Sequence, residues 1–212
     1  MVVELLKKLI LDPGSAIADG KKERSMKTTG ILLLINWIVA AISVYIIGNT
    51  LGTTFGPFNT IAGYIGMATG TVAIGGILLT AFIALMLQLT MNALGGKGGY
   101  WEGLSTLTYA TWPLAVGGLV ASILLLGGVW GIFISTLVLA ILGVLSAAIL
   151  FRSVKEMFGV EYLTVLIGLG IIGIGMSIAT AAGSAPLLNN VLAMRFVNML
   201  APLAGGMTLP VL

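Results

Sequence analysis

The stretch ILLLINWIVAAISVYII, residues 31–47, decides what kind of protein this is. It has no charged residue and lies within a longer uncharged run, 28–96, which two more follow at 103–151 and 162–194. A helix needs about 20 apolar residues to cross a hydrocarbon core roughly 30 Å thick. Only 8% of the 212 residues are charged, against about a quarter in a typical soluble domain. We therefore expect an all-α, polytopic transmembrane helical bundle.

Dividing the uncharged runs by the length of one crossing predicts five spans. They cover residues 28–48, 71–94, 109–126, 129–151 and 162–182. The segment 51–70 is rich in Gly and Thr and contains Pro57, which predicts a connection outside the membrane. The chain then divides into a cytoplasmic N-terminal segment (1–27), a five-helix domain (28–182) and an external or interfacial C-terminal segment (183–212). A sixth span within 184–212 is the alternative for that last segment.

The basic residues predict the orientation of this bundle. All of them except Arg195 fall in segment 1–27 or in the connections after the second and fourth spans. These three segments share one side of a five-span arrangement, and Lys and Arg are enriched in cytoplasmic loops. We expect the N-terminus in the cytoplasm and the C-terminus outside.

Residues 2–11 predict a short amphipathic helix in the headgroup layer, ended by Asp12-Pro13. The apolar face consists of Val2, Leu5, Leu6 and Leu9. The charged face consists of Glu4, Lys7 and Lys8.

Composition also argues against catalysis. The chain has no Cys and no His, the usual ligands of zinc and haem iron. No acid or base lies inside a predicted span, so nucleophile–base pairs have no members there. We expect no catalytic, cofactor-binding or metal-binding residues, no cofactor, no enzymatic activity and no nucleic-acid partner.

Three amide side chains are the strongest polar groups in or near the spans, namely Asn36, Gln88 and Asn92. An uncharged amide typically hydrogen-bonds across a helix interface, which is worth about 1 kcal/mol or less. The alternative is that the three line a polar cavity or ion path.

Two glycine-rich stretches invite nucleotide-binding interpretations. Lys97 stands among glycines at 95–99, but a P-loop requires a preceding strand and a Ser or Thr after the lysine. A cytoplasmic turn is favoured, with a lipid-headgroup or partner contact as the alternative. Gly168, Gly170 and Gly173 have dinucleotide-fingerprint spacing, but inside an apolar span they favour close helix packing.

The stretch LGGKGGYWEGLSTLTYATWPL, residues 94–114, resembles the signature region of the YIP family, five-pass membrane proteins named for interaction with Ypt/Rab-type GTPases. Eight positions carry the resemblance: Leu94, Gly95, Gly96, Lys97, Gly98, Tyr109, Ala110 and Pro113. Asp12-Pro13 is also similar to the family's N-terminus. The resemblance implies the same orientation that the charges predict.

Eukaryotic members have a long polar N-terminal region that is short here, so the chain resembles the prokaryotic branch, which implies a prokaryotic plasma membrane. The resemblance to the prokaryotic branch does not imply that this chain binds Rab-type GTPases. We expect a membrane-organising or partner-recruiting protein that contacts the lipid bilayer and a protein partner at its cytoplasmic loops. The alternatives are a transporter or channel for a neutral solute, lipid or monovalent ion, and an accessory subunit of a homo-oligomer or larger membrane complex.

Overall fold

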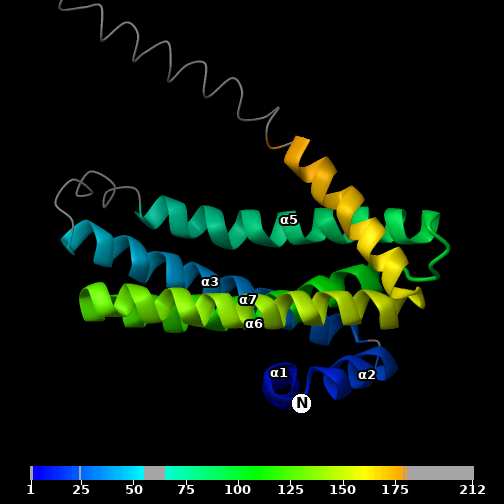
Figure 1. Cartoon of the computed structure of the whole chain (residues 1–212), viewed down its shortest axis with the longest axis horizontal. Coiled ribbons are helices and arrows are strands. Elements are labelled where there is room, and N and C mark those ends of the chain that lie inside the picture. The colour runs from blue at the N-terminus through cyan, green and yellow to red at the C-terminus, as the bar shows by residue number, and fades with distance from the viewer. Residues whose placement is uncertain (1, 24, 55–64, 179, 181–212) are drawn as a thin grey trace, which may run out of the picture. The chain divides into compact units, whose positions relative to one another are not determined.

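The computed structural model describes residues 2–23, 25–54, 65–178 and 180, and every regular element in that part of the chain is helical. The helices are α1 (Val2–Leu11), α2 (Pro13–Glu23), α3 (Met26–Thr54), α5 (Ile65–Ala93), α6 (Tyr100–Leu124) and α7 (Gly128–Phe158), with a short 3₁₀ turn η2 (Leu125–Gly127) between α6 and α7 (Figure 1). An apolar helix, Tyr162–Ile178, follows α7. The all-α prediction is confirmed.

The chain forms two units, Met1–Leu169 and Gly170–Leu212. In the second, residues 170–178 are helical, and the hydroxyl groups of Ser177 and Thr180 donate hydrogen bonds to backbone carbonyls of their own segment. The predicted C-terminal segment 183–212 lies outside the described residues. So does 55–64, the centre of the predicted connection.

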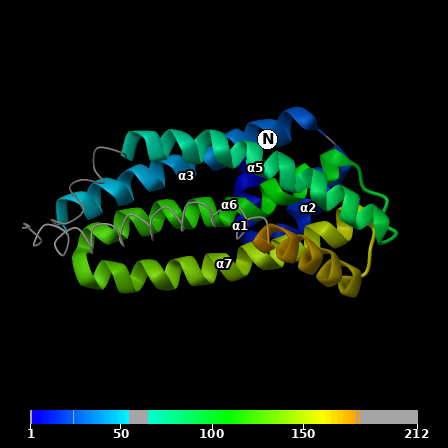
Figure 2. The ribbon, with the colours of Figure 1, turned by 90° about the horizontal axis from the view of Figure 1, so that it is seen from above.

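Three stretches of the first unit are long and apolar enough to cross a membrane: Met26–Thr50, Ile65–Ala93 and Tyr100–Phe158. The third stretch contains both α6 and α7, which reverse direction at η2 and pack along each other (Figure 2). The predicted turn at Gly127-Gly128 is therefore present, and Gly128 has a positive φ of 66°.

The helices extend beyond the predicted spans. α3 and α5 take up both ends of the predicted connection 51–70, and α6 begins at Tyr100 rather than near residue 109. Hydropathy marks what lies in lipid, whereas capping decides where a helix ends. At the start of α6 the Gly99 amide donates to the Glu102 carboxylate at 2.8 Å, which is half of a capping box.

Two glycines end the helices on either side of α6. Gly95, with φ of 92°, follows α5; Gly96 N–H donates to Met91 O at 2.8 Å and Gly95 N–H to Asn92 O at 3.1 Å. This pattern is a Schellman motif. Gly159, with φ of 67°, ends α7 in the same left-handed conformation.

α6 is the central helix of the first unit. It packs against α3, α5 and α7 and also contacts α1 and α2. A buried apolar cluster of Leu33, Ala84 and Leu104 joins α3, α5 and α6. Gly103 lets α5 approach, since a Cβ at this position would lie only 2.6 Å from the carbonyl oxygen of Ala84. Close backbone approach of this kind is how membrane helices gain contact.

Candidate functional site

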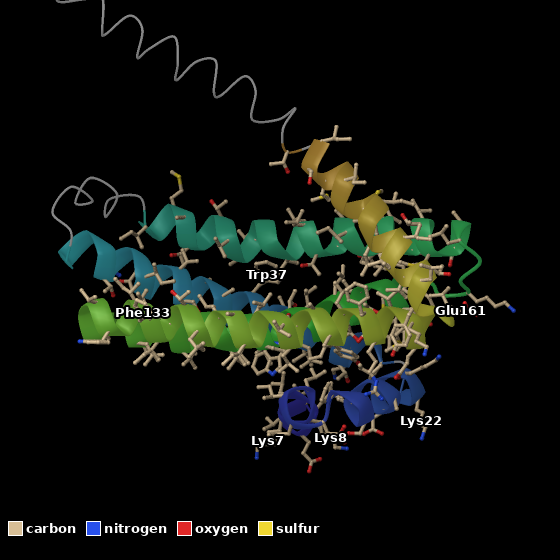
Figure 3. The ribbon with its side chains drawn as sticks, in the orientation of Figure 1. Lys7, Lys8, Lys22, Trp37, Phe133 and Glu161 are labelled. Carbon is tan, nitrogen blue, oxygen red and sulfur yellow. The ribbon has the colours of Figure 1, made fainter. Side chains whose placement is uncertain are left out.

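The N-terminal helices pack beside α6 and α7 at the end of the bundle where most basic residues lie (Figure 1). We call this region the basic end; it comprises α1, α2, the loop 94–99 and the segment 151–161. Figure 3 shows Lys7, Lys8 and Lys22 pointing away from the bundle.

α1 forms as the amphipathic pattern predicts and ends before Asp12-Pro13. The structure adds that the chain itself covers part of its apolar face, because Leu5 and Leu9 are buried. The indole N–H of Trp112, on α6, donates to the carbonyl oxygen of Leu6 at 3.1 Å. Val3 and Leu11 remain exposed.

α2 is a helix that the sequence analysis missed. The Asp12 carboxylate accepts a hydrogen bond from the Ser15 amide at 3.3 Å, and Pro13 is the first residue of the helix. An N-cap aspartate followed by proline at the first helical position is a recognised start signal. That signal was read only as the end of α1.

Small residues on α2 let it lie close to α6 and α7. Ala16 and Ile17 are fully buried. Gly20 lies against the Tyr109 phenol of α6, and Gly14 lies against the Arg152 guanidinium of α7. The Lys21 ammonium donates to the backbone carbonyl of Glu156.

An exposed ion pair joins α1 to α2. Lys8 pairs with Asp19 at 2.8 Å, and the hydrogen bond between them raises the pKa of Lys8 and lowers the pKa of Asp19. Hydrogen bonds from Ser15 lower the pKa of Asp12. Pairs this exposed contribute little to stability. The docking of α1 and α2 therefore depends mainly on their buried apolar side chains.

The first five signature residues form a turn fastened to the end of α7. The Lys97 amide donates to Phe158 O at 3.0 Å, and Gly98 lies directly against the buried Phe158 ring. The Lys97 side chain is exposed. A helix precedes this turn and the backbone amides of Gly95, Gly96 and Lys97 are already bonded, so the arrangement differs from a phosphate-binding loop.

The other three signature residues lie inside α6. Tyr109 is only 2% exposed, and the carbonyl of the buried Ala110 accepts a hydrogen bond from the Ser146 hydroxyl of α7. Pro113 lies in the helix interior rather than at its start. Proline has no N–H to donate within the helix. Side chains of neighbouring helices donate to the α6 backbone near this proline, Asn36 of α3 to Thr108 O and Ser146 of α7 to Ala110 O.

Of the three amides, Asn36 makes the cross-helix contact that its residue type favours. It is 2% exposed, and its Nδ2 donates to Thr108 O at 2.7 Å and to Thr111 Oγ1 at 2.9 Å. It also lines a cavity of about 360 Å³ between α3 and α6. The other two amides lie on α5, where Gln88 is half-buried and Asn92 is exposed. Neither of them lines this cavity.

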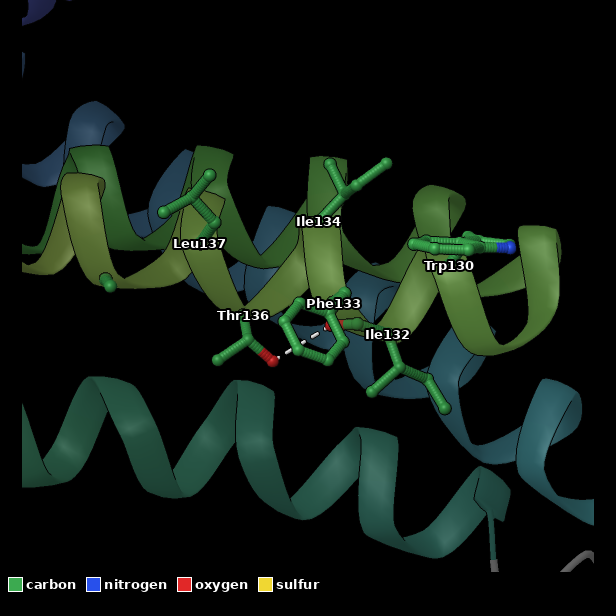
Figure 4. Close-up of a pocket in the computed structure, with 7 residues that line it drawn as sticks. Trp130, Ile132, Phe133, Ile134, Thr136 and Leu137 are labelled. Carbon is green, nitrogen blue, oxygen red and sulfur yellow. Dashed lines mark hydrogen bonds between the residues drawn. The ribbon is translucent and has the colours of Figure 1, made fainter.

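A second hollow, of about 650 Å³, lies over the first half of α7 (Figure 4). Its lining comes from α7 alone and is apolar apart from Thr136, whose hydroxyl donates to the carbonyl of Ile132 within the same helix. Phe133 and Trp130 are strongly exposed here. Such a surface suits lipid tails or another membrane helix, and its side-chain polar groups are limited to the Thr136 hydroxyl and the Trp130 indole N–H.

Within the described residues, no group of three or more His, Cys, Asp or Glu side chains is placed to hold a metal ion.

A family model described as the Yip1 domain matches residues 7–183. The matched range contains all eight signature residues, α2 and the segment of α7 on which α2 docks. No curated protein and no solved structure is similar enough to match.

Proposed function

Because the chain belongs to the Yip1 domain family, we propose that it is a non-enzymatic, multi-pass membrane protein that recruits or organises partners at the cytoplasmic surface. We assign it to the prokaryotic branch of the family and to the plasma membrane. It has five spans, with its N-terminus inside and its C-terminus outside.

The observation that carries this proposal is what the signature residues do. Gly98 and Lys97 fasten the loop to α7, and Tyr109 receives α2. They build a surface rather than a reaction pocket. That surface is rich in outward-pointing lysines and lies where the chain presents most of its charge (Figure 3). A charged surface held by buried contacts suits recognition of a soluble partner.

The reversal at η2 supports the five-span arrangement. α6 and α7 are each long enough to cross a hydrocarbon core, and they pack antiparallel. Counting them separately gives α3, α5, α6 and α7, and the helix Tyr162–Ile178 is the fifth. Lys97 and Glu161 then share one side of the membrane, and Gly127 lies on the other.

We expect single cysteines to report this arrangement cleanly, because the chain has no Cys of its own. In Gly127→Cys, a membrane-impermeant maleimide should label intact cells. In Lys97→Cys and Glu161→Cys, it should label only after permeabilisation. All three positions are exposed, so burial does not explain a difference. Labelling of Lys97→Cys and Gly127→Cys from the same side would contradict the arrangement.

Recruitment is tested with a photo-crosslinking amino acid at Lys22, on the outward face of α2, or at Phe133, on the exposed face of α7. We expect adducts with soluble cytoplasmic protein at position 22 and no protein adduct at position 133. No adduct at position 22 would overturn the recruitment proposal, whereas a membrane-protein adduct at position 133 would favour the accessory-subunit role instead.

Transport is less well supported. The cavity that contains Asn36 is lined almost entirely by apolar side chains, and the other two candidate amides do not contribute to it. An ion or polar solute requires a path of convergent polar groups through the membrane.

A further inference from the structure

The cavity between α3 and α6 is lined by Asn36, whose side-chain oxygen is buried and receives no hydrogen bond from the described residues. Its volume of about 360 Å³ falls in the range of about 300–1,000 Å³ typical of small-molecule sites. Ala40 and Gly118 have little or no side chain, which leaves the space open, and Leu139 of α7 closes one side. Trp37 also lines it and lies within the bundle, away from the outward-pointing lysines (Figure 3).

The orientation of the Asn36 amide is fixed. Its Nδ2 donates to the backbone carbonyl of Thr108, which only accepts hydrogen bonds. Oδ1 is therefore the remaining group, and it is buried and receives no hydrogen bond from the described residues. A buried acceptor left in this state costs about 1–3 kcal/mol.

The donors nearest to the cavity are already used within the chain. Ser43 donates to Val39 O at 2.8 Å, and the Trp37 indole donates to Thr80 Oγ1 at 3.1 Å. The Thr111 hydroxyl donates to backbone carbonyls of its own helix, the nearer being Leu107 O at 2.9 Å. None of these three groups is therefore left to donate to Asn36 Oδ1.

Water is a poor candidate for the donor to Asn36 Oδ1. A buried water needs two to four polar partners, whereas the surface of this cavity is almost entirely apolar; besides Asn36, its polar lining is limited to the hydroxyls of Ser43 and Thr111 and the indole N–H of Trp37, which already donate within the chain. Asn36 is also about 15 Å along α3 from Met26, at 1.5 Å per residue, which places it well inside the hydrocarbon layer. Molecules dissolved in the lipid phase are the ones that reach this depth.

We propose that the cavity binds a membrane-soluble lipid with a hydroxyl group on a long apolar body. Its apolar part fills the space beside Ala40 and Gly118, and its hydroxyl donates to Asn36 Oδ1 after a small shift of the side chains that cover this atom. Hydroxylated straight chains and isoprenoid alcohols share this chemistry.

The test uses Trp37 as the reporter in full-length protein reconstituted in bilayers. The probe is the bromohydrin of methyl oleate, in which a quenching bromine is adjacent to a mid-chain hydroxyl; its methyl ether has the same bromine and no donor. The signal assigned to Trp37 is the quenching in the wild type minus that in Trp37→Phe, because the chain has three other tryptophans.

We expect saturable quenching of Trp37 by the bromohydrin, with affinity about tenfold weaker for the ether, since one buried hydrogen bond is worth about 1.4 kcal/mol or a factor of ten. Unbrominated methyl hydroxystearate and an isoprenoid alcohol then compete separately, and the stronger competitor identifies the source. Equal quenching by bromohydrin and ether would show that the hydroxyl does not contribute to binding and would overturn the proposal.

Filling the cavity provides an independent arm. A Cβ at Gly118 would make ordinary contacts, the nearest at 3.5 Å from Ser43 Oγ, so Gly118→Ala is expected to fold and retain quenching. Gly118→Leu extends into the cavity and should abolish the saturable component. Gly75→Leu, on α5 with open space around it, is the matched control. Saturable quenching in Gly118→Leu equal to the wild type would also refute the site.

Discussion

Replacing Tyr109 with alanine is expected to lower the free energy of unfolding by about 3–5 kcal/mol and to release α2 from the bundle. Tyr109 is among the largest side chains with almost no exposed surface, at 2%. It lies on α6 directly against Gly20 of α2. Its truncation leaves a cavity at the centre of the basic end. Unfolding in mixed detergent measures the loss, and hydrogen exchange of residues 13–23 measures the release.

Two variants make this result specific. Tyr109→Phe retains the ring and is expected to cost about 1 kcal/mol or less, with α2 still protected. Phe133→Ala removes an aromatic ring that is 76% exposed on α7, so its effect should stay within about 0.5 kcal/mol. Similar losses from Tyr109→Ala and Phe133→Ala would mean that the basic end is not held by this contact.

Replacing Gly103 with alanine is expected to destabilise the protein by about 1–3 kcal/mol, although the residue lies inside a helix. Alanine in place of a helical glycine ordinarily stabilises by about 0.5–1 kcal/mol. Here the new Cβ would lie 2.6 Å from the backbone carbonyl oxygen of Ala84. A backbone atom does not move aside as a flexible side chain does, so α5 and α6 must separate.

The matched substitution is Gly75→Ala on α5, where a Cβ would meet nothing within 4 Å. We expect a small gain in the free energy of unfolding there and a loss at Gly103, both measured in the same detergent titration. Opposite signs for one chemical change separate helix propensity from helix packing. A gain at both positions would show that the close approach of α5 and α6 is relaxed at little cost.

Both predictions concern the segment that carries the family resemblance. Gly98 packs against the Phe158 ring, Gly103 packs against the backbone of α5, and Tyr109 packs against Gly20 of α2. The signature thus joins three separate parts of the chain to the start of α6. The cavity at Asn36 lies further along the same helix, beside Pro113, where α3 and α7 donate hydrogen bonds to the α6 backbone.

Several features could be predicted from the sequence because they depend on local composition. The uncharged runs identified helices that are long and apolar enough to cross a membrane, the distribution of Lys and Arg located the basic end, and residues 2–11 showed a helix with two distinct faces. The signature residues identified the family. Helix ends were predicted less well, since α3, α5 and α6 extend beyond the predicted spans.

The tertiary structure alone decided which faces meet. In a soluble helix the apolar stripe marks the buried side, but in a membrane both the lipid-facing and protein-facing sides are apolar. The sequences of α3 and α6 therefore do not show that Asn36 meets Thr108, that Gln88 and Asn92 lie elsewhere, or that α2 docks on Tyr109. Composition determines the solvent in which each segment is stable, whereas shape and backbone hydrogen bonding determine its neighbours.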